Sequence, residues 1–426
     1  MRDGSRGVEA FDEDYRENLA RYARLIVARG LNVQPGQLVN ISSELCHREL
    51  LGLLVEEAYR RGAGFVHVEF SDPILQRLRF QHSQPEFLDR VPGFFSAKFG
   101  ELVDERAANL KILGPEYPDF MEGLDPHLVN LARKAGYQSA KRFYNEGIEK
   151  SKVQWCVVAA ATARWAERLF PGLKGVDAER KLWREIFQIC RVDRPDYLEL
   201  WENHNSVLKK RAARLSEIGI SQLRFSGPRT DLRVGLHARA IFKGGADRSD
   251  KGLAFLPNIP TEECFTTPDW RTVSGRVAAT RPFLVNGVLV KDLSLTFEAG
   301  DLRSYSCSEG GASLEAYIAS DPGARRLGEV ALVGVDSPIF SSKIVFEEIL
   351  FDENAACHIA LGSAYRGCLQ GGTELSEEEC AEIGCNSSSV HTDIMISSEQ
   401  VNVFAELRGG GSLCLLQQGV WSPDFS

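Results

Sequence analysis

The sequence predicts a two-domain protein, with an N-terminal α/β domain of the βαβ type followed by a C-terminal strand-rich α+β domain. Three observations support this fold class. A chain of 426 residues exceeds what one hydrophobic core usually supports. Helical and strand patterns alternate in the first half, whereas short strands predominate in the second. A helical stretch at 197–215 lies where the pattern changes, so we expect domains at residues 1–205 and 206–426.

The first half begins with an amphipathic helix at 12–29, where apolar residues recur at helical spacing and Gly30 provides a stop signal. A Pro-Gly turn then leads to a strand at 38–41, a helix containing Leu50 and Leu54, and a strand at 65–70. This order predicts a βαβ unit, and because it lacks a GxGxxG turn it has no signature of a dinucleotide site. Further predicted elements are helices between 126 and 148 and at 178–190, and a strand at 153–160.

The second half is predicted to contain mainly short strands. They are expected at 223–225, 232–236, 275–280, 283–285 and 288–290. The last two flank Asn286-Gly287, a pair typical of the type I′ turn of a β-hairpin. Helices near 313–319 and 346–361 complete the predicted α+β domain.

Composition excludes several classes of protein. With 43% hydrophobic and 26% charged residues, the chain is typical of an ordinary globular protein. The net charge of -9 is spread over short mixed runs without a basic stripe, which argues against a nucleic-acid partner. No apolar run approaches the roughly 20 residues that span a bilayer, and the polar N-terminus lacks an apolar signal core. We therefore expect neither a membrane segment nor export.

The cysteines indicate the compartment. Ten scattered cysteines form no CxxC pair, which is typical of a reducing, cytoplasmic environment with most thiols in the core. Cys380 and Cys385 lie five positions apart in a polar loop at 366–386, a spacing open to a metal site or a disulfide. Without a second pair, neither interpretation is favoured.

Glu263 lies in a segment that three prolines keep extended. Pro257, Pro260 and Pro268 disfavour a helix around the Glu262-Glu263 pair, so a rigid loop can direct one carboxylate inward. In an arbitrary chain, a solvated pair of surface carboxylates is the more common interpretation.

Glu329 and His358 are two further candidates in apolar surroundings. Glu329 opens the apolar run 330–333, where a buried charge needs a partner, and an ion pair with Arg325 or Arg326 is the alternative. His358 lies in segment 352–362, which is predicted to form a short helix. A lone histidine on such a helix is more often a satisfied core residue than a ligand.

His391 and Asp393 form the more informative pair. Residues i and i+2 of the predicted strand at 391–396 point to the same face, so an imidazole and a carboxylate share one side. This mixture suits zinc and related divalent ions, although a lone HxD pattern often arises by chance.

Electrostatics connects these residues. If Glu263, Glu329 and Asp393 gathered within about 4 Å, each pair of carboxylates would repel by roughly 4 kcal/mol at an effective dielectric near 20. Bound cations make such a cluster tolerable. Two divalent cations together with one bridging hydroxide would bring the total charge to zero, and such a site lowers the pKa of bound water to about 7.

From about Arg21 to its end, the sequence resembles the thermophilic metalloaminopeptidase family, which includes aminopeptidases T, S and II. Four ordered strings carry the resemblance: FLPNIPTEE at 255–263, GARRLGEVALV at 323–333, LFDENAACHIALG at 350–362, and the strand that begins at His391. The resemblance implies that two divalent metal ions per subunit (zinc, cobalt, magnesium or manganese) are bound by Glu263, Glu329, His358, His391 and Asp393.

The resemblance also implies a reaction. The protein would be a metal-dependent aminopeptidase and homodimer that releases N-terminal amino acids from peptides with a free N-terminus, through water activated by two metals. Tyr365, seven residues after His358, would hydrogen-bond the tetrahedral intermediate. The chain departs from the family pattern at Thr392, Ile394 and Ser397 and in the loop 366–386, so we do not transfer side-chain preference.

Two other functions remain open at this point. The first is a mononuclear iron ring-cleaving dioxygenase of the hydroxypyridine type, because such enzymes resemble relatives that use this fold with fewer metal ligands. Retention of both Glu263 and Glu329 argues against it. A catalytically silent scaffold would not need five ligands. The general base is also open, because Glu262 adjoins Glu263 but neighbours in an extended segment face opposite ways.

Overall fold

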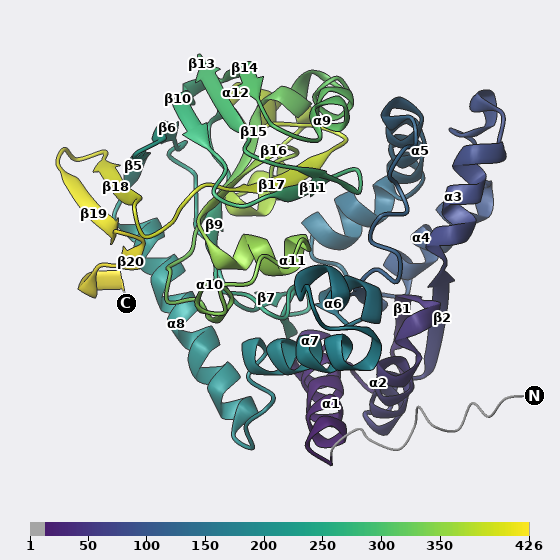
Figure 1. Ribbon diagram of the computed structural model, residues 1–426. Coiled ribbons are helices and arrows are strands. Elements are labelled where there is room, and N and C mark those ends of the chain that lie inside the picture. Colours follow the sequence, from purple (N-terminus) through teal and green to yellow (C-terminus); the bar gives the residue numbers. More distant parts are fainter. Residues whose placement is uncertain (1–12, 426) are drawn as a thin grey trace, which may run out of the picture.

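The computed structural model describes residues 13–425, and its first half is built around a parallel sheet (Figure 1). The four strands lie in the order β2-β1-β3-β4, and all neighbouring pairs are parallel. The strands are β1 (Leu38–Glu44), β2 (Phe65–Ser71), β3 (Ala108–Leu113) and β4 (Gln154–Ala159). The helices are α1 (Glu13–Leu25), α2 (Arg48–Arg60), α3 (Pro73–His82), α4 (Gly93–Asp104), α5 (Pro126–Ser139), α6 (Ala163–Leu169) and α7 (Gly175–Ile189).

Burial of apolar faces explains these first elements. The predicted first helix is confirmed by α1, which buries Leu19 and Tyr22, and the Tyr22 hydroxyl donates to the backbone oxygen of Ala159 in β4 at 3.1 Å. The predicted βαβ unit is confirmed by β1, α2 and β2, with Leu38 paired to Phe65 in parallel. The predicted helix start at Asp12 and the polar stretch before it lie outside the described residues.

The second half is strand-rich, as predicted. An eight-stranded sheet has the order β14-β13-β10-β6-β5-β18-β19-β20, and a four-stranded sheet has the order β17-β16-β15-β9. The strands are β5 (Ile220–Gly227), β6 (Thr230–Gly235), β7 (Asp247–Arg248), β8 (Ala254–Phe255), β9 (Cys264–Thr266), β10 (Ser274–Ala278), β11 (Phe283–Val285), β12 (Val288–Val290), β13 (Ser294–Glu298), β14 (Asp301–Ser306), β15 (Leu327–Leu332), β16 (His358–Gly362), β17 (His391–Met395), β18 (Asn402–Leu407), β19 (Ser412–Gln417) and β20 (Val420–Trp421). The helices are α8 (Tyr197–Glu217), α9 (Gly311–Ile318), α10 (Pro338–Ser341), α11 (Ile349–Asp352) and α12 (Glu377–Glu382).

The predicted hairpin is present. β11 and β12 pair antiparallel, and Asn286 and Gly287 between them have φ values of 54° and 78°. Two successive positive φ values are what a type I′ turn requires, which explains the Asn-Gly pair.

Helix α8 connects two hydrophobic cores. Its first turns place Tyr197 and Trp201 in the core around the parallel sheet. Its later turns place Leu208, Ala212 and Leu215 in the core of the strand-rich half. The first core also takes in segments from later in the chain, including Leu256, Ile259, Phe346 and Phe351. The two halves therefore share more than the connecting helix.

The predicted helix at 346–361 is wrong in most of its length. Only the single turn α11 and a 3₁₀ turn at Glu353–Ala355 precede β16, so His358 begins a strand rather than lying on a helix. All five residues of β16 are buried. A strand buried on both faces lacks the alternation that distinguishes strand from helix in a sequence.

Within residues 13–425, no helix combines the length and the apolar character needed to cross a membrane.

Candidate metal centre

Three adjacent strands place four of the five candidate ligands on one face of a sheet. Glu329 of β15 is opposite Ala360 of β16, and Ala360 is opposite Asp393 of β17. Residues aligned across neighbouring strands point the same way, as do residues two apart along one strand. His358, two before Ala360, and His391, two before Asp393, therefore join this face, and the small Ala360 leaves space between them.

Glu263 enters the same place from the fourth strand. It directly precedes β9, whose Cys264 pairs with Leu332 of β15. The side chains of Glu262 and Glu263 are 8% and 7% exposed, so the interpretation as a solvated surface pair is wrong. The alternative ion pair for Glu329 is also wrong, because Arg326 pairs with Asp301 at 3.0 Å and Arg325 donates to a backbone oxygen.

The distances divide the cluster into two groups. His358 Nε2 lies 3.2 Å from Glu263 Oε2 and 3.9 Å from both Glu329 Oε1 and Asp393 Oδ1. His391 Nε2 lies 3.2 Å from Glu329 Oε2 and 3.4 Å from Asp393 Oδ1. Each group offers three ligand atoms within 4.8 Å of one another. Glu329 belongs to both groups, with one carboxylate oxygen toward each.

Backbone carbonyls orient both imidazoles. Nδ1 of His358 lies 3.3 Å from the oxygen of Ala356, and Nδ1 of His391 lies 2.8 Å from the oxygen of Ser363. A carbonyl oxygen accepts only from a protonated nitrogen, so these contacts favour the Nδ1–H tautomer. The lone pair on each Nε2 then faces the carboxylates, an arrangement common among metal-binding histidines.

Burial and neighbouring charge set the protonation of the cluster. Burial raises the pKa of Glu329 to about 7, a hydrogen bond with His391 opposes this, and the charges of Asp393 and Glu263 add to it. Burial alone would lower the pKa of His358 and His391, but the surrounding carboxylates outweigh it and hold both pKa values well above 6.5. The carboxylates thus attract positive charge, and a divalent cation would replace protons there.

Two buried carboxylate oxygens test whether a metal fits. Glu263 Oε2 and Asp393 Oδ1 are fully enclosed and accept no hydrogen bond of good geometry. Such atoms are costly to bury unless something else satisfies them. Nitrogen and oxygen ligands about 2.0–2.2 Å from one ion lie roughly 3 Å apart, close to the separations seen here. The residues present therefore fit a divalent metal.

Tyr365 lies beside the cluster, just after β16. Its ring centroid is 5.2 Å from that of His391 and 5.7 Å from that of Phe265. Its backbone oxygen accepts a hydrogen bond from Thr267 at 2.7 Å, which fixes the start of the following loop. Burial and then the charge of Glu329 raise the pKa of Tyr365 well above 10, so the phenol keeps its proton.

Glu262 points away from the cluster, as expected in an extended segment. Its carboxylate lies 2.7 Å from Arg191 Nη2 and 3.4 Å from His204 Nε2. Two cationic or hydrogen-bonding partners occupy both oxygens, so Glu262 is poorly placed to take a proton from a substrate.

Glu353 is a carboxylate that the sequence argument did not single out. It lies in the 3₁₀ turn before β16, and its Oε1 lies 3.3 Å from Asn354 Nδ2 and 3.4 Å from Asn258 Nδ2. Burial and then the charges of Asp393 and Glu263 raise its pKa well above 4.5. Its turn, Glu353–Ala355, lies just before the strand that begins at His358. The sequence signal that could have identified Glu353 is the pair Asp352-Glu353 directly after the apolar residues Leu350 and Phe351.

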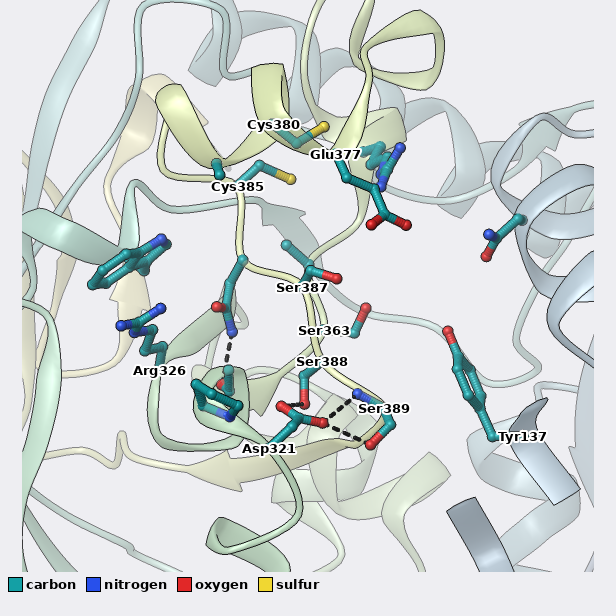
Figure 2. Close-up of a pocket in the computed structure, with 18 of the residues that line it drawn as sticks. Tyr137, Asp321, Arg326, Ser363, Glu377, Cys380, Cys385, Ser387, Ser388 and Ser389 are labelled. Carbon is teal, nitrogen blue, oxygen red and sulfur yellow. Dashed lines mark hydrogen bonds between the residues drawn. The ribbon is translucent and has the colours of Figure 1, made fainter. Parts of the chain in front are cut away.

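The structure contains a cavity of about 490 Å³ lined by residues that include Tyr137, Asp321 and Ser389 (Figure 2). Helix α5 and the segment after it form one wall, and the loop 363–389 forms the other. None of the five ligands lines this cavity, but Ser363 does, and its backbone oxygen is the acceptor for His391. Cys380 and Cys385 also line it as free thiols and pack with Ala364 and Leu369, so they are core residues of the loop rather than a disulfide.

Three carboxylates and two imidazoles gathered on one buried face define a metalloenzyme of the class that activates water at divalent ions. Comparison with known proteins specifies the class further. The family of thermophilic metalloproteases (M29) matches residues 15–421. The chain therefore belongs to the thermophilic metalloprotease (M29) family, and the predicted resemblance is confirmed.

Relatives cover nearly the whole chain. Aminopeptidase T of Thermus aquaticus is 39% identical over 96% of this chain and 99% of its own length. Aminopeptidase PepS of Streptococcus thermophilus is 36% identical over 96% and 98%. The solved structure of wild-type AmpT from Thermus thermophilus superposes with a TM-score of 0.87 at 38% identity, covering 96% of this chain and 99% of that one. None of these relatives is named as a dioxygenase or a scaffold, so neither alternative gains support.

Proposed function

We propose that this protein is a metal-dependent aminopeptidase that releases the N-terminal residue from peptides with a free amino terminus, using two divalent cations per chain. The observation that carries the proposal is the sharing of Glu329 between two groups of ligand atoms. A carboxylate with one oxygen toward each group is suited to bridge two ions. The nitrogen and oxygen ligands include no sulfur, so zinc, cobalt, magnesium and manganese all remain candidates.

Each residue has a distinct part in this proposal. Divalent cations, when bound, would activate water and polarise the scissile carbonyl. Glu263, Glu329, His358, His391 and Asp393 would hold them. Glu353 accepts the proton of the attacking water, because its carboxylate is near the ligands without belonging to either group. Tyr365 donates its hydroxyl hydrogen to the oxygen that becomes negative in the tetrahedral intermediate.

Hydrolysis of leucine p-nitroanilide by the purified protein tests the activity. Chelation should abolish hydrolysis, and zinc, cobalt, magnesium or manganese should restore it. Hydrolysis that survives exhaustive chelation, or that no metal supports, would contradict the proposal.

Metal analysis tests the number of ions. Relative to the wild type, we expect Glu263→Gln to lose one divalent ion per chain and Glu329→Gln to lose two, because Glu329 is common to both groups. Exposed Glu382→Gln is the matched control and should keep both ions. If Glu263→Gln and Glu329→Gln lose the same number of metal ions per chain, the result would argue against two separable metal sites.

The assembly and compartment also belong to the proposal. We expect a homodimer in the cytoplasm, without a nucleic-acid partner. Ten free cysteines support a reducing environment. The net charge of -9 disfavours binding to nucleic acid. Exposed apolar side chains on β2, α3 and α4 support a surface for a second copy.

A further inference from the structure

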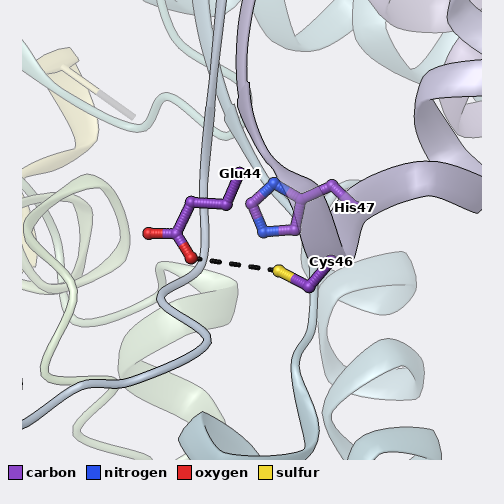
Figure 3. A group of neighbouring side chains, drawn as sticks. All are labelled: Glu44, Cys46 and His47. Atoms are coloured by element: carbon purple, nitrogen blue, oxygen red, sulfur yellow. Dashed lines mark hydrogen bonds between the residues drawn. The ribbon is translucent and has the colours of Figure 1, made fainter. Parts of the chain in front are cut away.

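A second group of potential metal ligands lies in the N-terminal half, apart from the proposed catalytic centre (Figure 3). Glu44 ends β1, and Cys46 and His47 occupy the turn that follows it. The Glu44 Oε2 and Cys46 Sγ atoms are 3.9 Å apart. One ligand atom from each of the three residues lies within 4.8 Å of the others.

The position of this group is typical of a ligand site. β1 pairs with β2 on one side and with β3 on the other, and the chain runs from β2 across to β3. The connections from β1 and β3 therefore leave the sheet in opposite directions at their carboxyl ends. Open parallel sheets bind ligands in the crevice at this switch point.

The segment after β3 holds two of the three side chains in place. The backbone N–H of Glu116 donates to Glu44 Oε2 at 2.9 Å. The oxygen of Gly114 lies 2.7 Å from His47 Nε2. Outer contacts of this kind fix the orientation of metal ligands before an ion binds.

The charge and protonation of the group also favour a cation. His47 is 4% exposed, and the contact of its Nε2 with the Gly114 oxygen favours the Nε2–H tautomer. The lone pair is then on Nδ1, which lies 3.3 Å from the Ser43 hydroxyl oxygen. Glu44 supplies a carboxylate, and Cys46, which is exposed, supplies a thiol that a divalent ion can reach from solvent.

We propose that Glu44, Cys46 and His47 bind one zinc-like divalent cation, with water as the fourth ligand. Oxygen, sulfur and nitrogen from carboxylate, thiolate and imidazole are ligands of zinc, whereas magnesium and calcium prefer oxygen alone. On binding, a metal–sulfur bond forms and the thiol proton leaves to solvent. All three ligands come from one short segment, so the fold does not depend on the ion.

Sulfur distinguishes this site from the catalytic centre. Cys264 and Cys357 adjoin the proposed ligands Glu263 and His358 in sequence, but their thiols contact backbone oxygens instead. Cys264 Sγ lies 3.7 Å from the oxygen of Leu208, and Cys357 Sγ lies 3.3 Å from the oxygen of Val333. A spectroscopic signal of metal–thiolate bonding therefore reports on Cys46 and is independent of the proposed peptidase activity.

Cobalt titration of the chelated, reduced full-length protein tests the proposal. Cobalt bound to a thiolate has an intense near-ultraviolet charge-transfer band, whereas cobalt on carboxylates and imidazoles does not. We expect a band that saturates at one cobalt ion per chain and is displaced by zinc. The band should be lost in Cys46→Ser and weakened in Glu44→Gln, and total bound metal should fall by one ion per chain.

Three controls separate the possible outcomes. Cys414→Ser, which removes another partly accessible free thiol, should keep the band. Glu329→Gln should also keep the band while losing the catalytic metals. Cys46→Ser should hydrolyse leucine p-nitroanilide at the wild-type rate. A wild-type protein without the band, or a band that persists in Cys46→Ser, would overturn the proposal.

Discussion

At the scale of single residues, Glu262 and Glu353 illustrate how surroundings decide the role of a carboxylate. Glu262 adjoins a proposed ligand in sequence but is neutralised by Arg191 at 2.7 Å. Glu353 is distant in sequence from Glu263, yet its pKa is raised by burial and by the charge of the ligands. The contacts of the Glu353 carboxylate are with the amide groups of Asn258 and Asn354, whereas Glu262 is held by a cationic side chain.

Glu353→Gln should lower kcat by about 10²–10⁴-fold, the usual contribution of a general base. The metal content should not change, because Glu353 belongs to neither ligand group. Steady-state kinetics with leucine p-nitroanilide and metal analysis on the same sample measure both. Glu262→Gln should lower the Tm, because Arg191 loses its partner, but should keep kcat. A loss of kcat in Glu262→Gln together with an unchanged kcat in Glu353→Gln would assign the general base to Glu262.

Tyr365→Phe should lower kcat by about 10²–10³-fold, as when one oxyanion donor is removed. The ring still packs against His391 and Phe265, so folding and metal content should be retained. Tyr317→Phe is the matched control, since its hydroxyl donates to the oxygen of Leu361 at 2.9 Å and its loss should affect stability rather than kcat. A wild-type kcat in Tyr365→Phe would remove this tyrosine from the mechanism.

At the scale of elements, the sequence predicted which residues lie together better than it predicted the element that carries each of them. The strand alternation of His391 and Asp393 is visible in sequence and is confirmed by β17. The segment 352–362 predicts a short helix around His358. In the structure β16 lies between β15 and β17 in its sheet and all five of its residues are buried, a tertiary arrangement that local periodicity does not report. That Glu329 and Asp393 align across Ala360 depends on strand register, which only pairing defines.

Gly328→Ala should disturb the metal centre through strand pairing. A Cβ at Gly328 would lie 2.2 Å from the oxygen of Ser363 and 2.4 Å from that of Gly362, so β15 must shift against β16. Overpacking of this kind destabilises by about 1–3 kcal/mol, and the shift should also weaken metal binding by Glu329. Urea denaturation and metal titration measure the two effects. Gly52→Ala, with nothing near its Cβ in α2, should instead stabilise by about 1 kcal/mol. Unchanged metal affinity in Gly328→Ala would contradict this account.

At the scale of the whole molecule, helix α3, which the sequence did not predict, is largely exposed. Of its ten residues, α3 buries only Pro73, while Leu75 is 64% exposed. The apolar residues of α3 therefore do not form the buried stripe of a helix that packs on the core of its own chain. For this reason the periodicity of the sequence did not predict α3. The two-domain division at 205/206 stays a prediction. The shared packing of Phe346 and Phe351 in the first core indicates that separated halves would expose apolar surface.

The final prediction concerns the homodimer. β2, α3 and α4 lie together on one flank of the molecule, and Phe65, Leu75 and Phe94 on these elements are 60%, 64% and 66% exposed (Figure 1). β2 is also the edge of the parallel sheet, so its outer backbone groups are available to a second copy. Burying each large apolar side chain contributes about 1.5–3 kcal/mol, so Leu75→Glu or Phe94→Glu should raise the dimer Kd at least about tenfold.

Sedimentation velocity over a range of protein concentrations measures this Kd. Val420→Glu is the matched control, because Val420 is 52% exposed but lies on β20 in the strand-rich half, and it should leave the Kd unchanged. A wild-type protein that is monomeric at every concentration would refute the dimer. A dimer that Val420→Glu weakens and Leu75→Glu and Phe94→Glu do not would place the interface on the strand-rich half.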